Sequence, residues 1–232
     1  MTSGYFLISD ILGFPKIVAS STEEDASARV QSWVELAERA GADAGITAMQ
    51  LISDTLFASA PDTSEGLGEL VRYSKMLSER GLECSLPIRG GVSHGQYEWG
   101  SLTYGKAVLS AHRIESSLEW VGIACEPELP HVADHWGFDS LVCYPAPFHS
   151  GPVRLCPVVA WGVPRYGEAS RLLCGGGLTK PKEVLGWDWR RKVSNTVQFG
   201  HYLALAQRHG VSPSQFYGLS PLEPMEIELF GE

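Results

Sequence analysis

The order of strand-like and helix-like segments is the feature that most limits how this chain can fold. A nearly continuous apolar run at 5–11 predicts a central buried strand. Apolar residues at helical spacing follow and stop at Gly41, which predicts a helix ending there. Residues 46–60 read as two strands joined by a tight turn at Ser53 and Asp54. A strand, a helix and a hairpin therefore open the chain.

The next segments extend this pattern. A second amphipathic helix is expected over 64–80, with Gly81 after it. A hairpin over 86–104 that turns near Gly95 comes next, and a third helix starts near Gly105. The order βαββαβ with an added strand and helix predicts an α+β fold of the ferredoxin-like kind, with helices on one face of an antiparallel sheet.

The second half is expected to add strands and a helical extension. In chain order the expected elements are strands at 121–125, 140–145 and 153–161, a linker at 170–181 and a helix over about 182–209. The side of that helix facing the body would carry Val184, Val193, Val197, His201 and Leu205. We therefore divide the chain into a main domain, 1–165, and a C-terminal linker and helical extension, 166–232, packed on it.

Charge and cysteine content exclude several classes of function. The chain has 18 Lys and Arg against 27 Asp and Glu, a net charge of −9, and such a surface repels nucleic acid polymers and anionic membranes. No apolar run reaches the twenty or so residues of a membrane span. Five widely spaced cysteines without a CxxC pair fit a reducing compartment. We expect a cytoplasmic protein.

Two aspartates end strand-like runs in similar phrases, ISDILGF at 8–14 and LISDTLF at 51–57. Either one alone fits a turn residue. In the predicted fold, however, Asp10 and Asp54 lie at neighbouring strand ends, where two carboxylates can hold a pair of Mg²⁺ or Mn²⁺ ions for displacement at phosphorus. The glycine-containing loop after Asp10 could direct backbone N–H groups at a phosphate. Arg113, on one helix face with Leu109, could stabilise an oxyanion.

Four phrases in order resemble the catalytic domain of class III nucleotidyl cyclases, over about residues 5–130. They are DILGF (10–14), LISDTLFA (51–58), RGGVSHG (89–95) and YGKAVLSAHRIES (104–116). The resemblance implies that Asp10, the Ile11 carbonyl and Asp54 bind two divalent cations. It also implies that the loop through Phe14 holds the triphosphate and that Arg113 stabilises the transition state. Such domains act as head-to-tail pairs, which implies a homodimer with shared active sites.

The positions that select a purine in that family are altered here. Gln50 stands where adenylate cyclases have Lys and guanylate cyclases Glu, and Leu102 occupies the second base-selecting position. Leu109 replaces the asparagine that orients the ribose, and no lysine is clearly matched to the one that grips the triphosphate. A glutamine amide carries donors and an acceptor that can pair with a pyrimidine edge.

The chain therefore resembles the pyrimidine cyclases of Pycsar antiphage defence. That resemblance implies a phosphorus–oxygen lyase that converts UTP to 3′,5′-cyclic UMP and pyrophosphate, and a downstream effector that binds the cyclic nucleotide. Three alternatives stay open: a cytidylate cyclase, an adenylate cyclase with atypical base contacts, and a catalytically silent cyclase-like binding module. Gln50 suits uracil or cytosine equally, because its amide can turn over.

Overall fold

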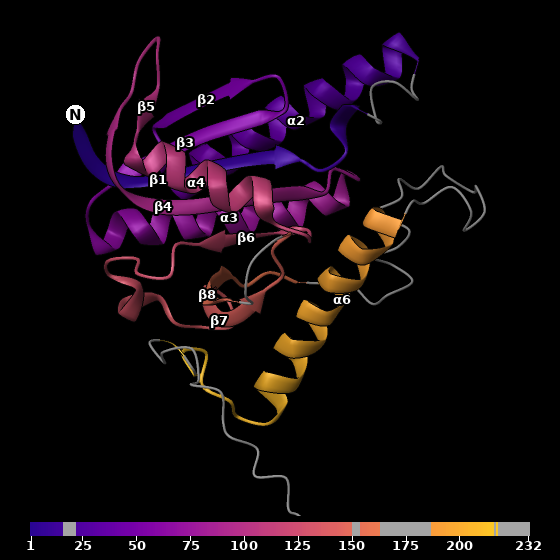
Figure 1. Ribbon diagram of the computed structural model, residues 1–232. Helices are drawn as coiled ribbons and strands as arrows, with labels where there is room; N and C mark the ends of the chain where they lie inside the picture. The colour runs from indigo at the N-terminus through magenta and orange to yellow at the C-terminus, as the bar shows by residue number, and fades with distance from the viewer. Residues whose placement is uncertain (16–21, 150–153, 163–186, 216, 218–232) are drawn as a thin grey trace, which may run out of the picture.

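Strand β1 is an interior strand of the sheet in the computed structural model (Figure 1), which describes residues 1–15, 22–149, 154–162, 187–215 and 217. In chain order the described elements are β1 (Thr2–Ile11), α2 (Glu23–Ala44), β2 (Ala48–Ile52), β3 (Thr55–Pro61), α3 (Ser64–Glu83), β4 (Ile88–Glu98), β5 (Tyr104–Gly105), α4 (Lys106–Ser117), β6 (Gly122–Cys125), the 3₁₀ turn η1 (Val132–His135), β7 (Leu141–Ala146), β8 (Arg154–Val159) and α6 (Trp187–Arg208).

The sheet order confirms the predicted ferredoxin-like core. Its strands run β2-β3-β1-β4-β6-β8-β7, with β5 paired to the end of β4. The pairs β2–β3, β3–β1 and β1–β4 are antiparallel, as the βαββαβ order requires. Strand β6 then joins β4 in parallel, and β8 and β7 continue the sheet antiparallel. The fold is α+β, as predicted.

The helices cover both faces of this sheet, so the prediction that they share one face is wrong. Alternate residues of a strand point to opposite faces. On β1, Tyr5 and Leu7 are buried in the cluster that contains the apolar residues of α2 and α3. Phe6 lies instead with Ala107 and Ala111 of α4. Figure 1 shows α4 in front of β1 and β4, with α2 and α3 behind the sheet.

Three glycines predicted to end elements lie inside them. Helix α2 continues past Gly41 to a left-handed glycine at 45 (φ 88°), and α3 continues past Gly81 to Glu83. A β-carbon on Gly81 would lie 2.6 Å from Ile88 Cδ1, so this glycine permits close packing rather than a stop. Strand β4 runs straight through Gly95, and the turn to β5 occupies 99–103.

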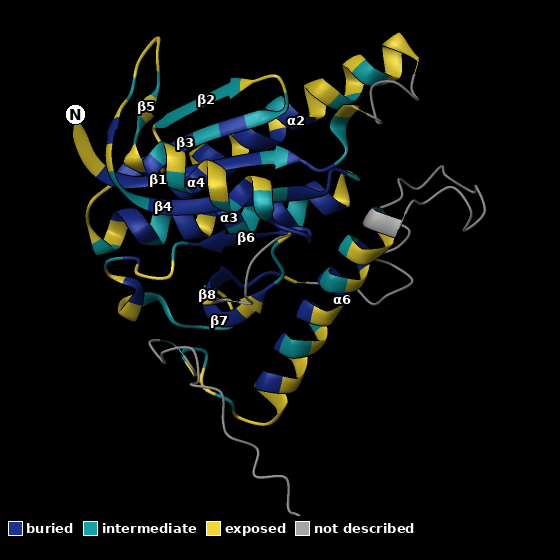
Figure 2. Ribbon diagram, in the orientation of Figure 1, coloured by how far each residue is buried: buried dark blue, intermediate teal, exposed yellow. Residues whose placement is uncertain are grey.

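Helix α6 packs on the far half of the sheet through a stripe that is rotated away from the predicted one. Val193 and Val197 are buried, as expected, but His201 is exposed and Leu205 is 54% exposed. Figure 2 shows buried and exposed positions alternating along α6. The buried stripe passes instead through Leu203, with Phe199 fully buried. Val184, the linker at 170–181 and the boundary at 165/166 lie outside the described residues. No helix in the described part of the chain is long and apolar enough to cross a membrane.

Candidate active site

The carboxylate of Asp10 is held by an arginine on the neighbouring strand. Asp10 and Arg89 are direct cross-strand partners on β1 and β4. Arg89 Nη2 lies 2.9 Å from Asp10 Oδ2, and Arg89 Nε lies 3.2 Å from Asp10 Oδ1. The same Nη2 is 2.7 Å from Glu115 Oε1 on α4. One half-buried guanidinium therefore pairs with two carboxylates at the end of β1.

A glycine brings α4 close enough for Glu115 to take part. A β-carbon on Gly91 would collide with the backbone carbonyl of Ala111, so only glycine allows the helix this near to β4. Ser93 donates to the Ala107 carbonyl at 2.5 Å and fixes the first turn of the helix on the same strand. Ala111 and Glu115 are one turn apart on the buried side of α4, so Glu115 points at the sheet.

Burial dominates the electrostatics of this trio. Glu115 keeps only 6% of its side chain exposed, and burial followed by the charge of Asp10 raises its pKa to about 7. Arg89 opposes that rise through its charge and hydrogen bond. Near neutral pH the trio therefore holds a charged arginine beside a glutamate that can take up or release a proton.

Asp54 lies at the same end of the sheet. Strands β1 and β3 pair with Ser9 opposite Leu56, so the register continued by two residues sets Asp54 across from Ile11. Ser53 takes a left-handed conformation (φ 61°) in the two-residue turn between β2 and β3. Asp54 is half-buried, and no side-chain hydrogen bond or ion pair of it occurs among the described residues. The C-terminal end of β1 and this turn therefore lie at the same end of the sheet's strands.

The donor atoms at this edge suit hard divalent cations in their chemistry. Asp10, Asp54 and the Ile11 carbonyl offer oxygen atoms, which Mg²⁺ and Mn²⁺ prefer. Within the described ranges no three His, Cys, Asp or Glu side chains form a group that could hold a metal ion, so two carboxylates would need carbonyl, water or substrate oxygens to complete a coordination shell. Asp10 would also have to divide its oxygens between cation and Arg89.

Helix α4 presents Arg113 to solvent rather than to its own Asp10. Arg113 is exposed and Leu109, one turn earlier, is 59% exposed, so the two share a face as predicted. Residues two apart on a helix point about 200° apart, which places Arg113 away from the buried Glu115. In this chain alone, therefore, Arg113 and Asp10 do not form one site.

The other predicted residues are spread along the same half of the sheet. Phe14 is half-buried against the core under α2 and α3. Gln50 is half-buried on β2, opposite Phe57 of β3. Leu102 is 70% exposed in the segment between β4 and β5. None of these three touches the Asp10–Arg89–Glu115 trio through a hydrogen bond within the described residues.

Sequence reasoning missed Arg89 and Glu115 as parts of the site. The available signal was a charge on a buried stripe: Glu115 continues the line of Ala107 and Ala111 at intervals of four residues. Arg89 similarly follows buried Ile88 in a strand with both faces covered. A charge at such positions indicates a paired, buried ion.

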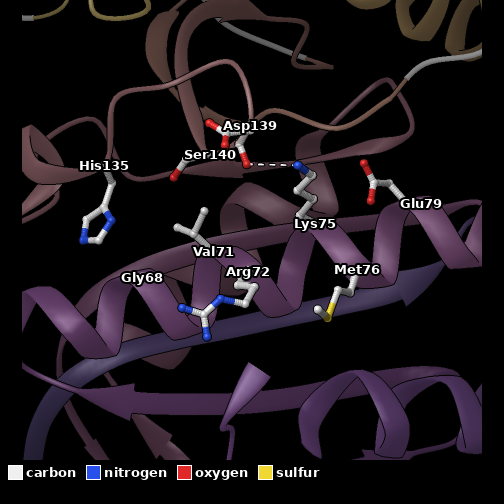
Figure 3. Close-up of a pocket in the computed structure, with 9 residues that line it drawn as sticks. All are labelled: Gly68, Val71, Arg72, Lys75, Met76, Glu79, His135, Asp139 and Ser140. Carbon is white, nitrogen blue, oxygen red and sulfur yellow. Dashed lines mark hydrogen bonds between the residues drawn. The ribbon is translucent and has the colours of Figure 1, made fainter. Parts of the chain in front are cut away.

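A cavity of about 400 Å³ lies elsewhere, on the outer side of α3 (Figure 3). It is lined by Gly68, Val71, Arg72, Lys75, Met76, Glu79, His135, Asp139 and Ser140. Lys75 reaches across it to the Asp139 carbonyl at 3.1 Å, and His135 Nε2 lies 2.8 Å from the Ser64 carbonyl. None of the predicted site residues lines this cavity.

Comparison with known proteins identifies the fold. No protein-family model and no curated protein matches the chain. Among solved structures, a bacterial light-regulated adenylyl cyclase is 17% identical and matches 68% of this chain and 90% of its own, with a TM-score of 0.52. The adenylyl cyclase CyaB of P. aeruginosa is 16% identical, over 67% of this chain and 91% of that chain, with a TM-score of 0.52. The catalytic core of a rhodopsin-guanylyl cyclase with converted specificity, in complex with ATPalphaS, is 15% identical. The match covers 68% of this chain and 96% of that chain, with a TM-score of 0.55. The chain therefore has the fold of class III adenylyl and guanylyl cyclase catalytic domains.

Proposed function

We propose that this chain is a cytoplasmic nucleotide cyclase that converts UTP to 3′,5′-cyclic UMP and pyrophosphate. The observation that carries the proposal is the meeting of two strand ends in a cyclase fold. Asp10 ends β1, and the turn that bears Asp54 lies across from Ile11 at the same edge of the sheet. Carboxylates so placed are what cyclisation at an α-phosphorus needs.

The residues at this end of the sheet would have separate roles in the reaction. Two divalent cations, Mn²⁺ or Mg²⁺, held by Asp10, Asp54 and the Ile11 carbonyl, would acidify the ribose 3′-hydroxyl and offset charge on the leaving group. Arg89 would keep the Asp10 carboxylate from rotating away. The loop through Phe14 would orient the triphosphate with its backbone N–H groups. The 3′-oxygen bonds to the α-phosphorus, the bond to the β-phosphate bridging oxygen breaks, and the hydroxyl proton leaves to solvent.

Arg113 would act on the active site of a second copy. It is exposed and turned away from its own Asp10, so it can offset transition-state charge only across an interface. Large apolar side chains are exposed on the same helix and just before it: Leu109 (59%), Tyr104 (46%) and Leu102 (70%). Apolar side chains gathered in this way on α4 and before β5 favour a buried contact, here a head-to-tail homodimer.

Gln50 is the residue we assign to reading the base. Its amide can donate to O4 of uracil and accept from N3–H, and the apolar Leu102 offers no group that would pair with a purine edge. Cytosine is satisfied when the amide turns over, so a cytidylate cyclase is the nearest alternative. A cyclic pyrimidine nucleotide acts as a messenger only through a protein that binds it, so we include a downstream effector and a role in antiphage defence in the proposal.

The test is the product formed from each of the four nucleoside triphosphates with Mn²⁺. We expect cyclic UMP as the main product, whereas cyclic AMP as the main product would refute the pyrimidine assignment. Asp54→Asn and Arg113→Ala should each lower kcat by at least about a hundredfold. The matched surface controls Asp139→Asn and Arg39→Ala should leave it unchanged. No product from any triphosphate would favour the silent binding module.

A further inference from the structure

Helix α6 covers the loop that directly follows Asp10 and Ile11. Gly13 sits in that loop in a left-handed conformation (φ 82°). A β-carbon there would lie 3.8 Å from Cζ3 of Trp189, the described atom nearest to it. Leu12 is buried in the apolar cluster against which Trp189 packs. The indole ring of Trp189 therefore forms one wall of the turn that links β1 to residue 14.

The same helix fixes the segment that follows α4. Arg191 Nη2 lies 2.9 Å from Glu119 Oε2, a carboxylate with 11% of its side chain exposed. Asn195 Nδ2 donates to the Glu119 carbonyl at 2.8 Å. The backbone N–H of Val121 donates to Thr196 Oγ1 at 2.9 Å. Side chains of α6 thus hydrogen-bond backbone groups of residues 119 and 121 and tie this segment to the helix.

These two contact regions converge on Asp10. The segment held by α6 begins just after Leu118, whose carbonyl accepts a long hydrogen bond (3.5 Å) from Arg89 Nη1. Arg89 in turn holds both oxygens of Asp10. Trp189 meets the chain three residues beyond Asp10 on the other side. The C-terminal helix therefore touches the chain on both sides of the candidate site.

We propose that Trp189 is a positioning residue that fixes the loop Leu12–Phe14 for a substrate polyphosphate, and that α6 is part of the catalytic domain. The identity of that substrate rests on the proposed function. A glycine in a left-handed turn gives this loop conformational freedom, and a ring packed against it removes that freedom before the ligand binds. Preorganised backbone N–H groups then bind phosphate without first being ordered.

The experiment compares two aromatic truncations on the same helix. Phe199 is fully buried and meets Trp120 edge-to-face with ring centroids 4.5 Å apart, about 15 Å along the helix from Trp189. Trp189→Ala and Phe199→Ala should both lower stability. Only Trp189→Ala should speed amide hydrogen exchange at residues 12–14, by about tenfold. Only this variant should also raise KM for UTP by about tenfold, with a smaller change in kcat. Trp189→Phe should restore wild-type values, and Trp189→Leu replaces the alanine variant if that does not fold.

The outcomes separate this inference from the proposed function. Equal exchange and equal KM in the Trp189 and Phe199 variants would overturn the positioning role and leave α6 a structural support only. An inactive wild-type protein would refute the cyclase proposal, but hydrogen exchange at residues 12–14 would still decide whether Trp189 orders the loop. The exposed Leu205→Ala should change none of these readouts.

Discussion

Glu115 is expected to give the metal-free protein a pH-dependent stability that Glu115→Gln removes. Burial beside Asp10 raises its pKa from 4.5 to about 7. A carboxyl whose pKa is raised by folding stabilises the folded state fully below its unfolded pKa, and that contribution is lost as pH rises through the folded value. Each pKa unit is worth about 1.4 kcal/mol, so the full loss between about pH 4.5 and pH 8 is roughly 3 kcal/mol.

Urea denaturation with EDTA at about pH 5 and pH 8 measures this difference. Glutamine keeps the volume of Glu115 and can still hydrogen-bond Arg89, so the packing part of its effect is the same at both pH values. The wild-type free energy of unfolding, minus that of the variant, should fall by roughly 2.5 kcal/mol from pH 5 to pH 8, because part of the contribution is already lost at pH 5. Glu38→Gln, on the exposed side of α2, should show no such change. Parallel pH curves for wild type and Glu115→Gln would refute the reasoning.

Three further substitutions test the site's supports. Arg89→Met removes the cation shared by half-buried Asp10 and buried Glu115 and should lower the free energy of unfolding by about 3–5 kcal/mol; a loss under about 1 kcal/mol in urea denaturation would contradict the pairing. Gly91→Ala should push α4 off β4 and cost about 1–3 kcal/mol in the same assay, whereas Gly100→Ala, with open space around it, should cost nothing measurable. Leu109→Glu should shift sedimentation toward monomer, and Leu205→Glu should not; equal effects of the two would speak against an α4 interface.

The core of the fold could be predicted because its signals are local. An apolar run, helical spacing and a tight turn at Ser53 and Asp54 define β1, α2, β2, β3 and α3, and the sheet order follows from their sequence. The glycines were read wrongly for a physical reason. Gly81 lets α3 pack closely on Ile88, and Gly95 lies within a continuous strand β4. A sequence pattern cannot register these distant contacts and treats each glycine as the end of a helix or strand.

The candidate site was predicted only in part. Asp10 and Asp54 could be predicted because each follows an apolar, strand-like run in the sequence. The partners of Asp10 come from β4 and α4, about eighty and a hundred residues further on, and depend on Gly91 letting the helix approach. Likewise, apolar spacing indicates that α4 and α6 each bury one side, but it does not identify the part of the protein against which that side packs. The sheet face under α4 and the Trp189 contact with Gly13 needed the three-dimensional structure.

Mixing two inactive variants tests the central claim most directly. In a head-to-tail dimer, Asp54→Asn and Arg113→Ala damage different halves of each shared site. Random pairing makes half the dimers mixed, and each mixed dimer keeps one intact site of two, so the mixture should form cyclic UMP at roughly a quarter of the wild-type rate. Each variant alone should form almost none. A mixture no more active than the two variants separately would contradict a site built from Asp10 and Asp54 of one copy and Arg113 of the other.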